Sequence, residues 1–309
     1  MDGFTDSPMR ALQGEIGSFT FAVSEFIRVS NNTLPPKVFQ RDVPELLNEG
    51  QTSTGLPVQI QILGGNPRLM AESAQSALKA GAQSIDINFG CPAPTVNNHD
   101  GGATLLQKPQ RVREVVAAVR EALPAEVSVS AKLRLGWDDI QQVHENAAMA
   151  EAGGASWIVI HARTKMQRYR PPVHWGLLNE VRKARKVPIV ANGDIWTLQD
   201  FQRCREQTGC RHFMLGRGAL VNPLLATQVA QDLGLRVKPS PKSFLWSNLL
   251  RGLARHSQNQ TDKLRKNTLH RLKQWLNLAR KFGSFEHFDE LKRLQTQEEF
   301  FDRMALLEL

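Results

Sequence analysis

The sequence has few cysteines and no long hydrophobic run. Cys91, Cys204 and Cys210 form no Cys-x-x-Cys pair and are odd in number, which argues against a disulfide framework and a zinc knuckle. No apolar run approaches the roughly 20 residues of a membrane-spanning helix, and the first residues lack the basic and apolar regions of a secretory signal. We therefore expect a cytoplasmic protein with no metal site, no membrane segment and no obligate protein partner.

Acidic residues are the minority charge. The chain has 39 Lys and Arg against 30 Asp and Glu, a net charge of +9 and a pI of about 9.7, and this excess favours a polyanionic partner. With 41% hydrophobic and 22% charged residues, the composition excludes a disordered or collagen-like chain and predicts a soluble globular protein.

Short apolar runs alternate with amphipathic stretches through the first three quarters of the chain, which predicts repeated βα units around a parallel sheet. A region of about 230 residues built in this way predicts an α/β fold of the (β/α)8 TIM-barrel type. Seven runs are present where eight strands are needed, so we expect the first strand to be missing from this chain. The runs are residues 19–24, 58–63, 84–88, 127–133, 157–161, 188–191 and 212–215.

A stretch with glycine and prolines at 233–243 interrupts this alternation and predicts a linker. The predicted division is a barrel domain at 1–235 and a small all-α helical domain at 242–309. Between residues 251 and 281, nine Lys or Arg accompany a single acid, Asp262. This imbalance predicts a surface that contacts nucleic-acid phosphates, and a solvated basic face is the alternative.

Polar residues follow several predicted strands at their carboxyl ends, where barrel enzymes place their chemistry. A period of two puts Lys132 and Arg134 on one strand face, and two cations there need an anion nearby. The same period puts Gln59 and Gln61 on one face of the run at 58–63, and His161 ends the run at 157–161. Each alone is equally compatible with a core residue bonded to the backbone, but their coincidence favours a site.

The loops after the last two runs carry Asn192-Gly193-Asp194 and Gly216-Arg217-Gly218. Glycines let backbone N–H groups approach phosphate oxygens and arginine supplies a charged fork, so these loops predict a phosphate site. Ordinary turn chemistry is the alternative.

Cys91 follows the third run and is expected at the rim of the barrel mouth. A thiol with the usual pKa of about 8.5 is mostly protonated at neutral pH and is a competent proton donor. A nucleophile of lowered pKa and an inert buried cysteine are the alternatives.

Taken in order, these segments resemble the motif series of the tRNA-dihydrouridine synthases over nearly the whole chain. They are residues 1–6 (MDGFTD), 86–92 (DINFGCP), 132–134 (KLR), 161–164 (HART), 192–194 (NGD) and 216–218 (GRG). Residues 24–29 (SEFIRV), 37–39 (KVF) and 271–276 (RLKQWL) are more similar to the bacterial C-type branch, which acts on tRNA position 16.

The resemblance implies an FMN enzyme whose flavin is reduced by NADPH and whose substrate is tRNA. Gln61 and Lys132 would contact the isoalloxazine, and the other residues would surround the ribityl and phosphate groups. The implied cofactor-binding residues are Met1, Gln61, Lys132, His161, Asn192, Gly193, Asp194, Gly216 and Arg217.

For the substrate, the resemblance implies that Asn88 holds the uracil and that Cys91 protonates C5 after hydride reaches C6. Arg134 and Tyr169 would grip the target nucleotide. Arg271 and Lys273, in the basic helical segment, would contact the RNA backbone.

Three alternatives remain at this point. The chain could be a non-catalytic tRNA-binding protein or RNA chaperone, if the absent first strand abolishes FMN binding. It could also be a flavin barrel of the dihydroorotate type, or an aldolase with Lys132 as a Schiff base. The basic helical segment disfavours the last two, because a small substrate needs no such surface.

Overall fold

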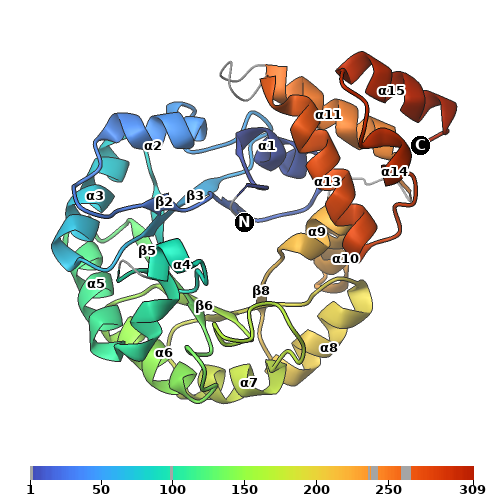
Figure 1. Cartoon of the computed structure of the whole chain (residues 1–309). Helices are drawn as coiled ribbons and strands as arrows, with labels where there is room; N and C mark the ends of the chain where they lie inside the picture. Colours follow the sequence, from blue (N-terminus) through green and yellow to red (C-terminus); the bar gives the residue numbers. More distant parts are fainter. Residues whose placement is uncertain (1–2, 98–99, 236, 238–242, 259–265) are drawn as a thin grey trace.

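The structure is a curved parallel sheet ringed by helices, with a cluster of further helices against one side (Figure 1). It is a computed structural model that describes residues 3–97, 100–235, 237, 243–258 and 266–309. The strands run in the order β1-β3-β4-β5-β6-β7-β8, with β2 also paired to β3, and every neighbour is parallel. Their bounds are β1 Ala22–Val23, β2 Ile27–Arg28, β3 Val58–Leu63, β4 Ser84–Asn88, β5 Ser128–Arg134, β6 Trp157–His161, β7 Ile189–Asn192 and β8 His212–Met214.

The barrel-type fold expected from the sequence is confirmed, and every predicted strand is found. The run at 19–24 contains β1, which pairs with the start of β3. The short strand β2 follows that run, was not predicted, and pairs with the end of β3, so β1 and β2 share one position in the sheet. Seven strand positions result. Within the described residues no pairing joins β8 to β1 or β2, so the sheet is an open barrel.

The helices around the sheet alternate with the strands, as βα units require. Proline at the first or second helical position begins several of them, and Thr197 and Asp200 form a capping box at the start of α8. Their bounds are α1 Ser7–Ile16, α2 Pro36–Asp42, η1 Pro44–Leu47, α3 Pro67–Lys79, α4 Pro94–Asn97, η2 Gly102–Gln107, α5 Pro109–Glu121, α6 Gln142–Ala152, α7 Trp175–Ala184, α8 Leu198–Thr208, α9 Arg217–Val221 and α10 Leu225–Asp232.

Two faces of the sheet have different chemistry, because successive side chains in a strand point to opposite sides. Ile60, Ile85 and Val129 are fully buried among the aliphatic side chains of the surrounding helices. The alternate positions, such as Asp86 and Ser130, are polar and face the inside of the barrel. This polar interior leads toward the carboxyl ends of the strands.

A second hydrophobic cluster joins the chain's last helices to the barrel. These helices are α11 Trp246–Gln258, α13 Thr268–Phe282, α14 Phe288–Leu291 and α15 Gln297–Leu306. Their cluster also contains Met9 and Leu12 of α1 and Leu220 of α9, and the indole Nε1 of Trp275 donates to the Leu220 carbonyl at 2.8 Å. Figure 1 shows α11 and α13 lying against α1 and α9. The core therefore crosses the predicted linker, much of which lies outside the described residues, and the division into two domains stays a prediction.

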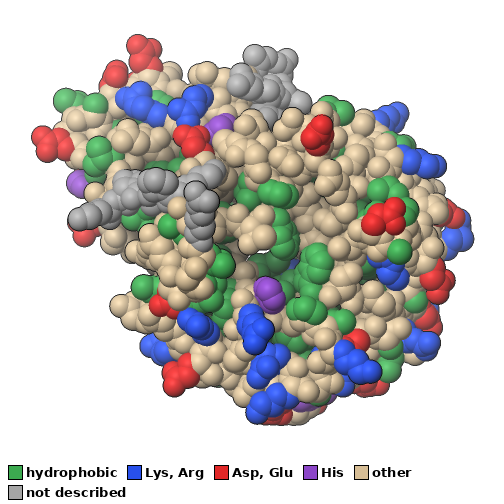
Figure 2. Space-filling view, turned by 180° about the vertical axis from the view of Figure 1, so that it is seen from behind, with side chains coloured by type: hydrophobic (Ala, Val, Ile, Leu, Met, Phe, Trp, Pro, Cys, Tyr) green, Lys and Arg blue, Asp and Glu red, His purple; other side chains and the backbone are tan. Residues whose placement is uncertain are grey.

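The surface carries both signs of charge. Seen from behind, hydrophobic side chains and a histidine border a hollow near the centre of the view, Lys and Arg gather below it, and Asp and Glu are scattered mainly toward the edges (Figure 2). Among the described residues, no helix combines the length and hydrophobicity needed to cross a membrane. No group of three or more His, Cys, Asp or Glu in the same residues is placed to hold a metal ion.

Candidate active site at the carboxyl ends of the strands

A chain of buried hydrogen bonds crosses the inside of the barrel and converges on Asp86. The carboxylate accepts from Ser130 Oγ at 2.5 Å and from Gln61 Nε2 at 2.6 Å, and Gln61 Oε1 in turn accepts from Asn88 Nδ2 at 2.8 Å. Burial raises the pKa of Asp86, although both donors and the charge of Lys132 oppose that shift. This arrangement fixes which way the Gln61 and Asn88 amides face.

Lys132 lies on β5 beside this chain. Its Nζ donates to Asn192 Oδ1 at 3.1 Å, and the Asn192 amide donates to the Met214 carbonyl at 2.8 Å. Burial and the neighbouring Arg134 lower the pKa of Lys132 to about 8, against the opposing charge of Asp86. The amine is therefore mostly a cation at neutral pH, but it titrates far earlier than an ordinary lysine.

His161 ends β6 as a neutral imidazole. Burial, and then four nearby cations, hold the pKa of His161 well below its usual value. Within the described residues its ring nitrogens make no hydrogen bond, so they are available to a ligand. Gly193 lies against the ring: its φ is +116°, and a Cβ there would stand 2.7 Å from the His161 Cδ2. Only glycine fits this position.

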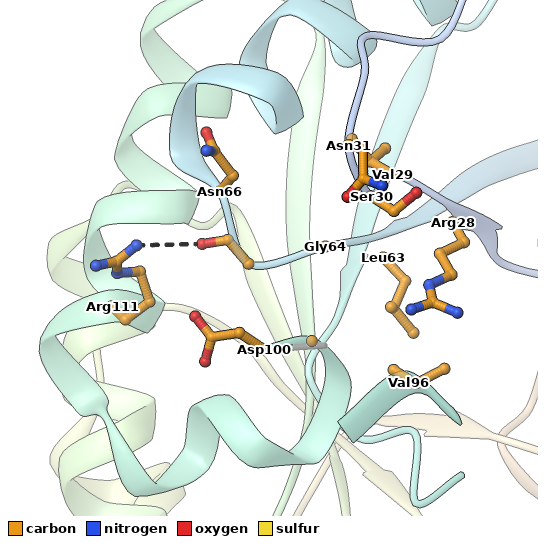
Figure 3. Close-up of a pocket in the computed structure, with 12 residues that line it drawn as sticks. Arg28, Val29, Ser30, Asn31, Leu63, Gly64, Asn66, Val96, Asp100 and Arg111 are labelled. Carbon is orange, nitrogen blue, oxygen red and sulfur yellow. Dashed lines mark hydrogen bonds between the residues drawn. The ribbon is translucent and has the colours of Figure 1, made fainter. Parts of the chain in front are cut away.

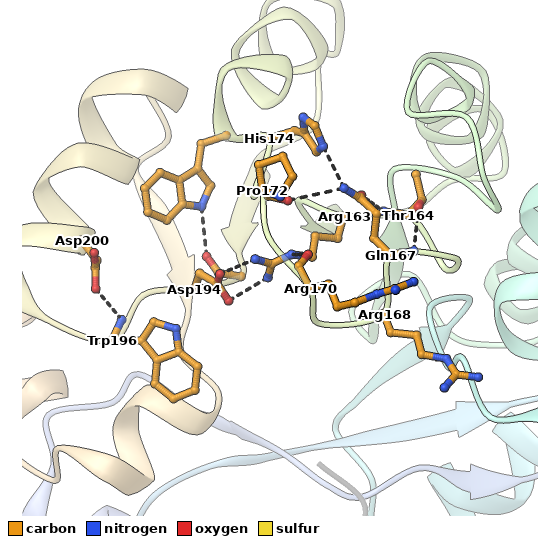
Figure 4. Close-up of polar contacts among 12 residues, drawn as sticks. Arg163, Thr164, Gln167, Arg168, Arg170, Pro172, His174, Asp194, Trp196 and Asp200 are labelled. Carbon is orange, nitrogen blue, oxygen red and sulfur yellow. Dashed lines mark hydrogen bonds and ion pairs between the residues drawn. The ribbon is translucent and has the colours of Figure 1, made fainter. Parts of the chain in front are cut away.

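Asp194 ties two loops of the mouth together (Figure 4). It forms a bidentate ion pair with Arg163, in which the guanidinium NH1 lies 2.7 Å from Oδ1. The Arg163 side chain is fully buried. Arg163 Nε also donates to the Arg170 carbonyl at 2.7 Å, and the Trp175 indole donates to the Gly193 carbonyl at 2.9 Å. The carboxylate of Asp194 is thus already paired, and the pair holds the loop at residues 192–194 in place.

Arg217, the first residue of α9, lies among aromatic rings. Its guanidinium carbon is 4.4 Å from the ring centre of Tyr169, 4.9 Å from that of Trp196 and 5.0 Å from that of Phe282. Burial lowers the pKa of this half-buried group. Its N–H groups donate no hydrogen bond within the described residues, which leaves them open to an anion. Gly216 precedes it as the N-cap of α9.

The loop that carries Cys91 is held at several points. The Gly90 N–H donates to Asn88 Oδ1 at 2.9 Å, and the Gly90 carbonyl accepts from Arg134 Nε at 2.8 Å. The carbonyl of Cys91 accepts from the Ala103 N–H at 3.1 Å, while the residue itself is only partly buried. The backbone of Cys91 is therefore held at the mouth, and its side chain is partly accessible there. Burial, by contrast, raises the pKa of Cys204 to about 12.

Three cations that the sequence assigns to the substrate are engaged in the protein itself. Arg134 is 2% exposed and donates to the carbonyls of Gly90, Thr164 and Arg168. Arg271 pairs with Asp6 at 2.9 Å, and Lys273 Nζ donates to the Leu294 carbonyl. Their predicted roles in substrate binding stay predictions.

A pocket of about 170 Å³ opens beside the mouth, at the end of β3 (Figure 3). Arg28, Asn66, Asp100 and Arg111 are among its lining residues, and Arg111 reaches the Gly65 carbonyl at 3.4 Å. None of the predicted site residues lines it, so the candidate site lies outside this pocket.

The remaining predicted residues gather at the same end of the sheet. They are Gln61, Asn88, Cys91, Lys132, His161, Tyr169, Asn192, Gly193, Asp194, Gly216 and Arg217, whereas Met1 lies outside the described residues. Sequence reasoning missed Asp86, Trp196 and Phe282 as parts of the site. Strand alternation was the available signal for Asp86, since it shares a face with Asn88. Nothing in the sequence pairs Trp196 with Phe282.

The fold and site define a parallel α/β barrel whose polar residues converge at the carboxyl ends of its strands. Among solved structures, histamine dehydrogenase from Rhizobium sp. 4-9 is similar with a TM-score of 0.57 at 13% identity, over 82% of this chain and 47% of that one. An old yellow enzyme homologue from Zymomonas mobilis gives 0.51 at 16% identity, over 86% and 91%. At such low identity these likenesses concern the fold.

The dihydrouridine synthase (Dus) family model matches residues 1–308, and the chain belongs to this family. A tRNA-dihydrouridine(16) synthase from Shewanella oneidensis is 40% identical over 303 residues, which are 97% of this chain and 93% of the relative. The protein of the same name from Haemophilus influenzae is 40% identical over 97% and 95%. That from Pasteurella multocida is 42% identical over 91% and 88%.

Proposed function

We propose that this protein is a cytoplasmic tRNA-dihydrouridine synthase that uses FMN and NADPH to reduce a D-loop uridine at position 16. The family match supports the reaction class, and the names of its relatives support tRNA as substrate and position 16 as target. The observation that carries the proposal is the convergence of Lys132, neutral His161 and Arg217 on one mouth beside Cys91. Family membership also favours flavin chemistry over the aldolase alternative.

The residues at the mouth fit an anionic group that is rich in hydrogen-bond acceptors. The side chains of Arg217 and His161 have no hydrogen-bond partner among the described residues, and Lys132 uses one of its three N–H donors on Asn192. FMN, when bound, supplies the hydride after its reduction by NADPH. Gln61 and Lys132 would bind its ring, and Arg217 with the loops at Gly193 and Gly216 would bind its phosphate.

Asn192 and Asp194 support this cofactor site indirectly. The Asn192 amide bonds to Lys132 and to the Met214 carbonyl, and Asp194 is paired with Arg163. These contacts fix the Lys132 amine and the Gly193 turn, which would then bind the cofactor in fixed positions. Such fixed donors stabilise charge without having to reorganise during the reaction.

The same mouth suits a uracil taken out of the RNA stack, which costs a few kcal/mol. One N–H of the Asn88 amide is used on Gln61, and the other has no acceptor within the described residues. Reduction at C6 builds enolate character on C5 and O4. The Cys91 thiol would donate its proton to C5, and the nearby Lys132 cation would relieve the charge on the oxygen.

The decisive experiment is incubation of the purified protein with FMN, NADPH and unmodified tRNA, followed by mass spectrometry of the digested RNA. A gain of two hydrogens at uridine 16 is the expected result. Cys91→Ala should retain FMN and tRNA binding but lose about 10²- to 10⁴-fold in turnover, as removal of a general acid does. Equal activity in Cys91→Ala would remove that residue as the acid. RNA binding without any reduction would instead favour the non-catalytic alternative.

A further inference from the structure

The aromatic cage around Arg217 is built from two distant parts of the chain. Trp196 follows β7 of the barrel, whereas Phe282 is the last residue of α13, in the helical segment. Their rings are stacked, with centroids 5.1 Å apart and planes 16° from parallel. Arg217 lies within 5.0 Å of both ring centres. The helical segment thus supplies one wall of a site that otherwise belongs to the barrel.

This wall restricts a side chain that would otherwise be mobile. An arginine has many rotamers, and fixing it before a ligand arrives reduces the entropy lost on binding. Aromatic faces cover the flat sides of a guanidinium and attract its charge. The N–H groups of Arg217 donate no hydrogen bond within the described residues, and such groups can form paired hydrogen bonds with a phosphate.

We propose that Phe282 is a positioning residue for Arg217, so that the docking of α13 on the barrel and the binding of the FMN phosphate strengthen each other. This inference rests on the proposed function, since it takes FMN as the ligand at Arg217. Coupling of two equilibria is reciprocal. Removal of the Phe282 ring therefore weakens FMN binding, and bound FMN in turn reduces local unfolding at the end of α13.

The test measures FMN affinity of the flavin-stripped full chain by quenching of flavin fluorescence, which requires no turnover. Loss of one cation–π contact should weaken FMN binding about 3- to 30-fold in Phe282→Ala. Phe282→Trp restores a large ring face and should bind within about twofold of the wild type. Hydrogen exchange of α13 should slow when FMN is added to the wild type, and should slow less in Phe282→Ala.

Phe301→Ala is the matched control. Phe301 also lies under an arginine, 4.6 Å from the Arg251 guanidinium, but in the helical segment and outside the cage. Its loss should leave FMN affinity unchanged. Phe282→Leu covers the case in which the alanine variant folds poorly, because leucine keeps the apolar contact and lacks the ring face.

The outcomes separate the two proposals. Wild-type affinity for FMN in both Phe282→Ala and Phe282→Leu would overturn the positioning role while leaving the proposed function intact. An equal loss in Phe301→Ala would also overturn it, because the effect would then be a general one of the helical segment. A wild-type chain that binds no FMN would overturn the cofactor assignment and this inference together.

Discussion

The hydrogen bonds that link Ser130, Gln61 and Asn88 to Asp86 all run toward its carboxylate. Ser130 and Gln61 both donate to it, and Asn88 donates to Gln61. A carboxylate only accepts, whereas an asparagine also presents two N–H donors. The charge of Asp86 therefore decides the orientation of two amides that would meet flavin and uracil.

Asp86→Asn should lower turnover about 10- to 100-fold with little change in tRNA affinity, because a donor facing Gln61 forces its amide to turn and misplaces Asn88. Single-turnover reduction rates and RNA binding curves check this. Asp42→Asn, at an exposed carboxylate paired with Arg41, is the control. A loss of tRNA affinity equal to the loss in rate would contradict the positioning role.

Lys132 should make stability depend on pH. Its folded pKa of about 8 lies below the value of about 10.4 in an unfolded chain. Between these values the folded state holds fewer protons, so the free energy of unfolding rises with pH across that interval. At pH 7 the buried charge destabilises the fold.

Lys132→Met should therefore be about 1 to 4 kcal/mol more stable than the wild type at pH 7, and this advantage should shrink as the pH passes from 8 to above 10. Urea unfolding at both pH values provides the measurement. A constant difference across the range would show that Lys132 titrates normally. The same variant should bind FMN poorly, since it lacks the amine.

The sequence predicts some of these residues but not the contacts that they make. Lys132, His161 and Arg217 could be predicted because strand ends and glycine loops mark positions at a barrel mouth. The pairing of Asp194 with Arg163, and that of Arg134 with three carbonyls, could not. Such pairings depend on how loops from neighbouring strands fold over one another, and no local pattern records that.

At the scale of the element, α13 shows what amphipathic spacing can and cannot predict. Leu272, Leu276 and Ala279 fall at helical spacing and are fully buried, as the sequence indicates. The excess of Lys and Arg between residues 251 and 281 predicts that all the cations on the exposed face contact RNA phosphates. In the structure, however, Lys273 and Arg271 are bonded within the protein, whereas Lys266 and Lys281 are exposed.

Lys266→Gln with Lys281→Gln should weaken tRNA binding. The slope of the logarithm of the binding constant against the logarithm of the salt concentration should fall by about one to two, because each phosphate contact that is removed reduces the number of counterions released on binding. Binding is measured by filter retention across a range of salt. Lys273→Gln is the matched variant and should change the slope less. A larger effect at Lys273 would show that its contact with Leu294 opens when RNA binds.

For the whole molecule, the shared hydrophobic cluster determines whether the helical segment is an independent domain. Met9, Leu12 and Leu220 are buried in the barrel part but belong to the cluster of the last helices. Composition predicts the linker at 233–243. Composition carries no information on contacts between the start of a chain and its end, such as those of Met9 and Leu12 with the last helices. The strand order, by contrast, follows from short right-handed crossovers and was predictable.

A chain ending at residue 235 should aggregate or melt at a clearly lower temperature than the full chain, because it exposes this apolar surface. Size-exclusion chromatography and thermal unfolding measure both. Polar substitutions at Met9 and Leu12 should restore part of its solubility. A soluble truncated chain with the melting temperature of the full protein would establish two independent domains.

Tyr169 is the one tyrosine of the chain, and it lies between the guanidinium groups of Arg134 and Arg217 with its ring about half exposed. The mouth therefore contains an intrinsic reporter at a single position. Growth on fluorotyrosine would give one ¹⁹F resonance, which the ring currents of a flavin or of an extruded base would shift. Occupancy of the mouth could then be followed in solution with no substitution in the chain and only one hydrogen of the ring replaced by fluorine.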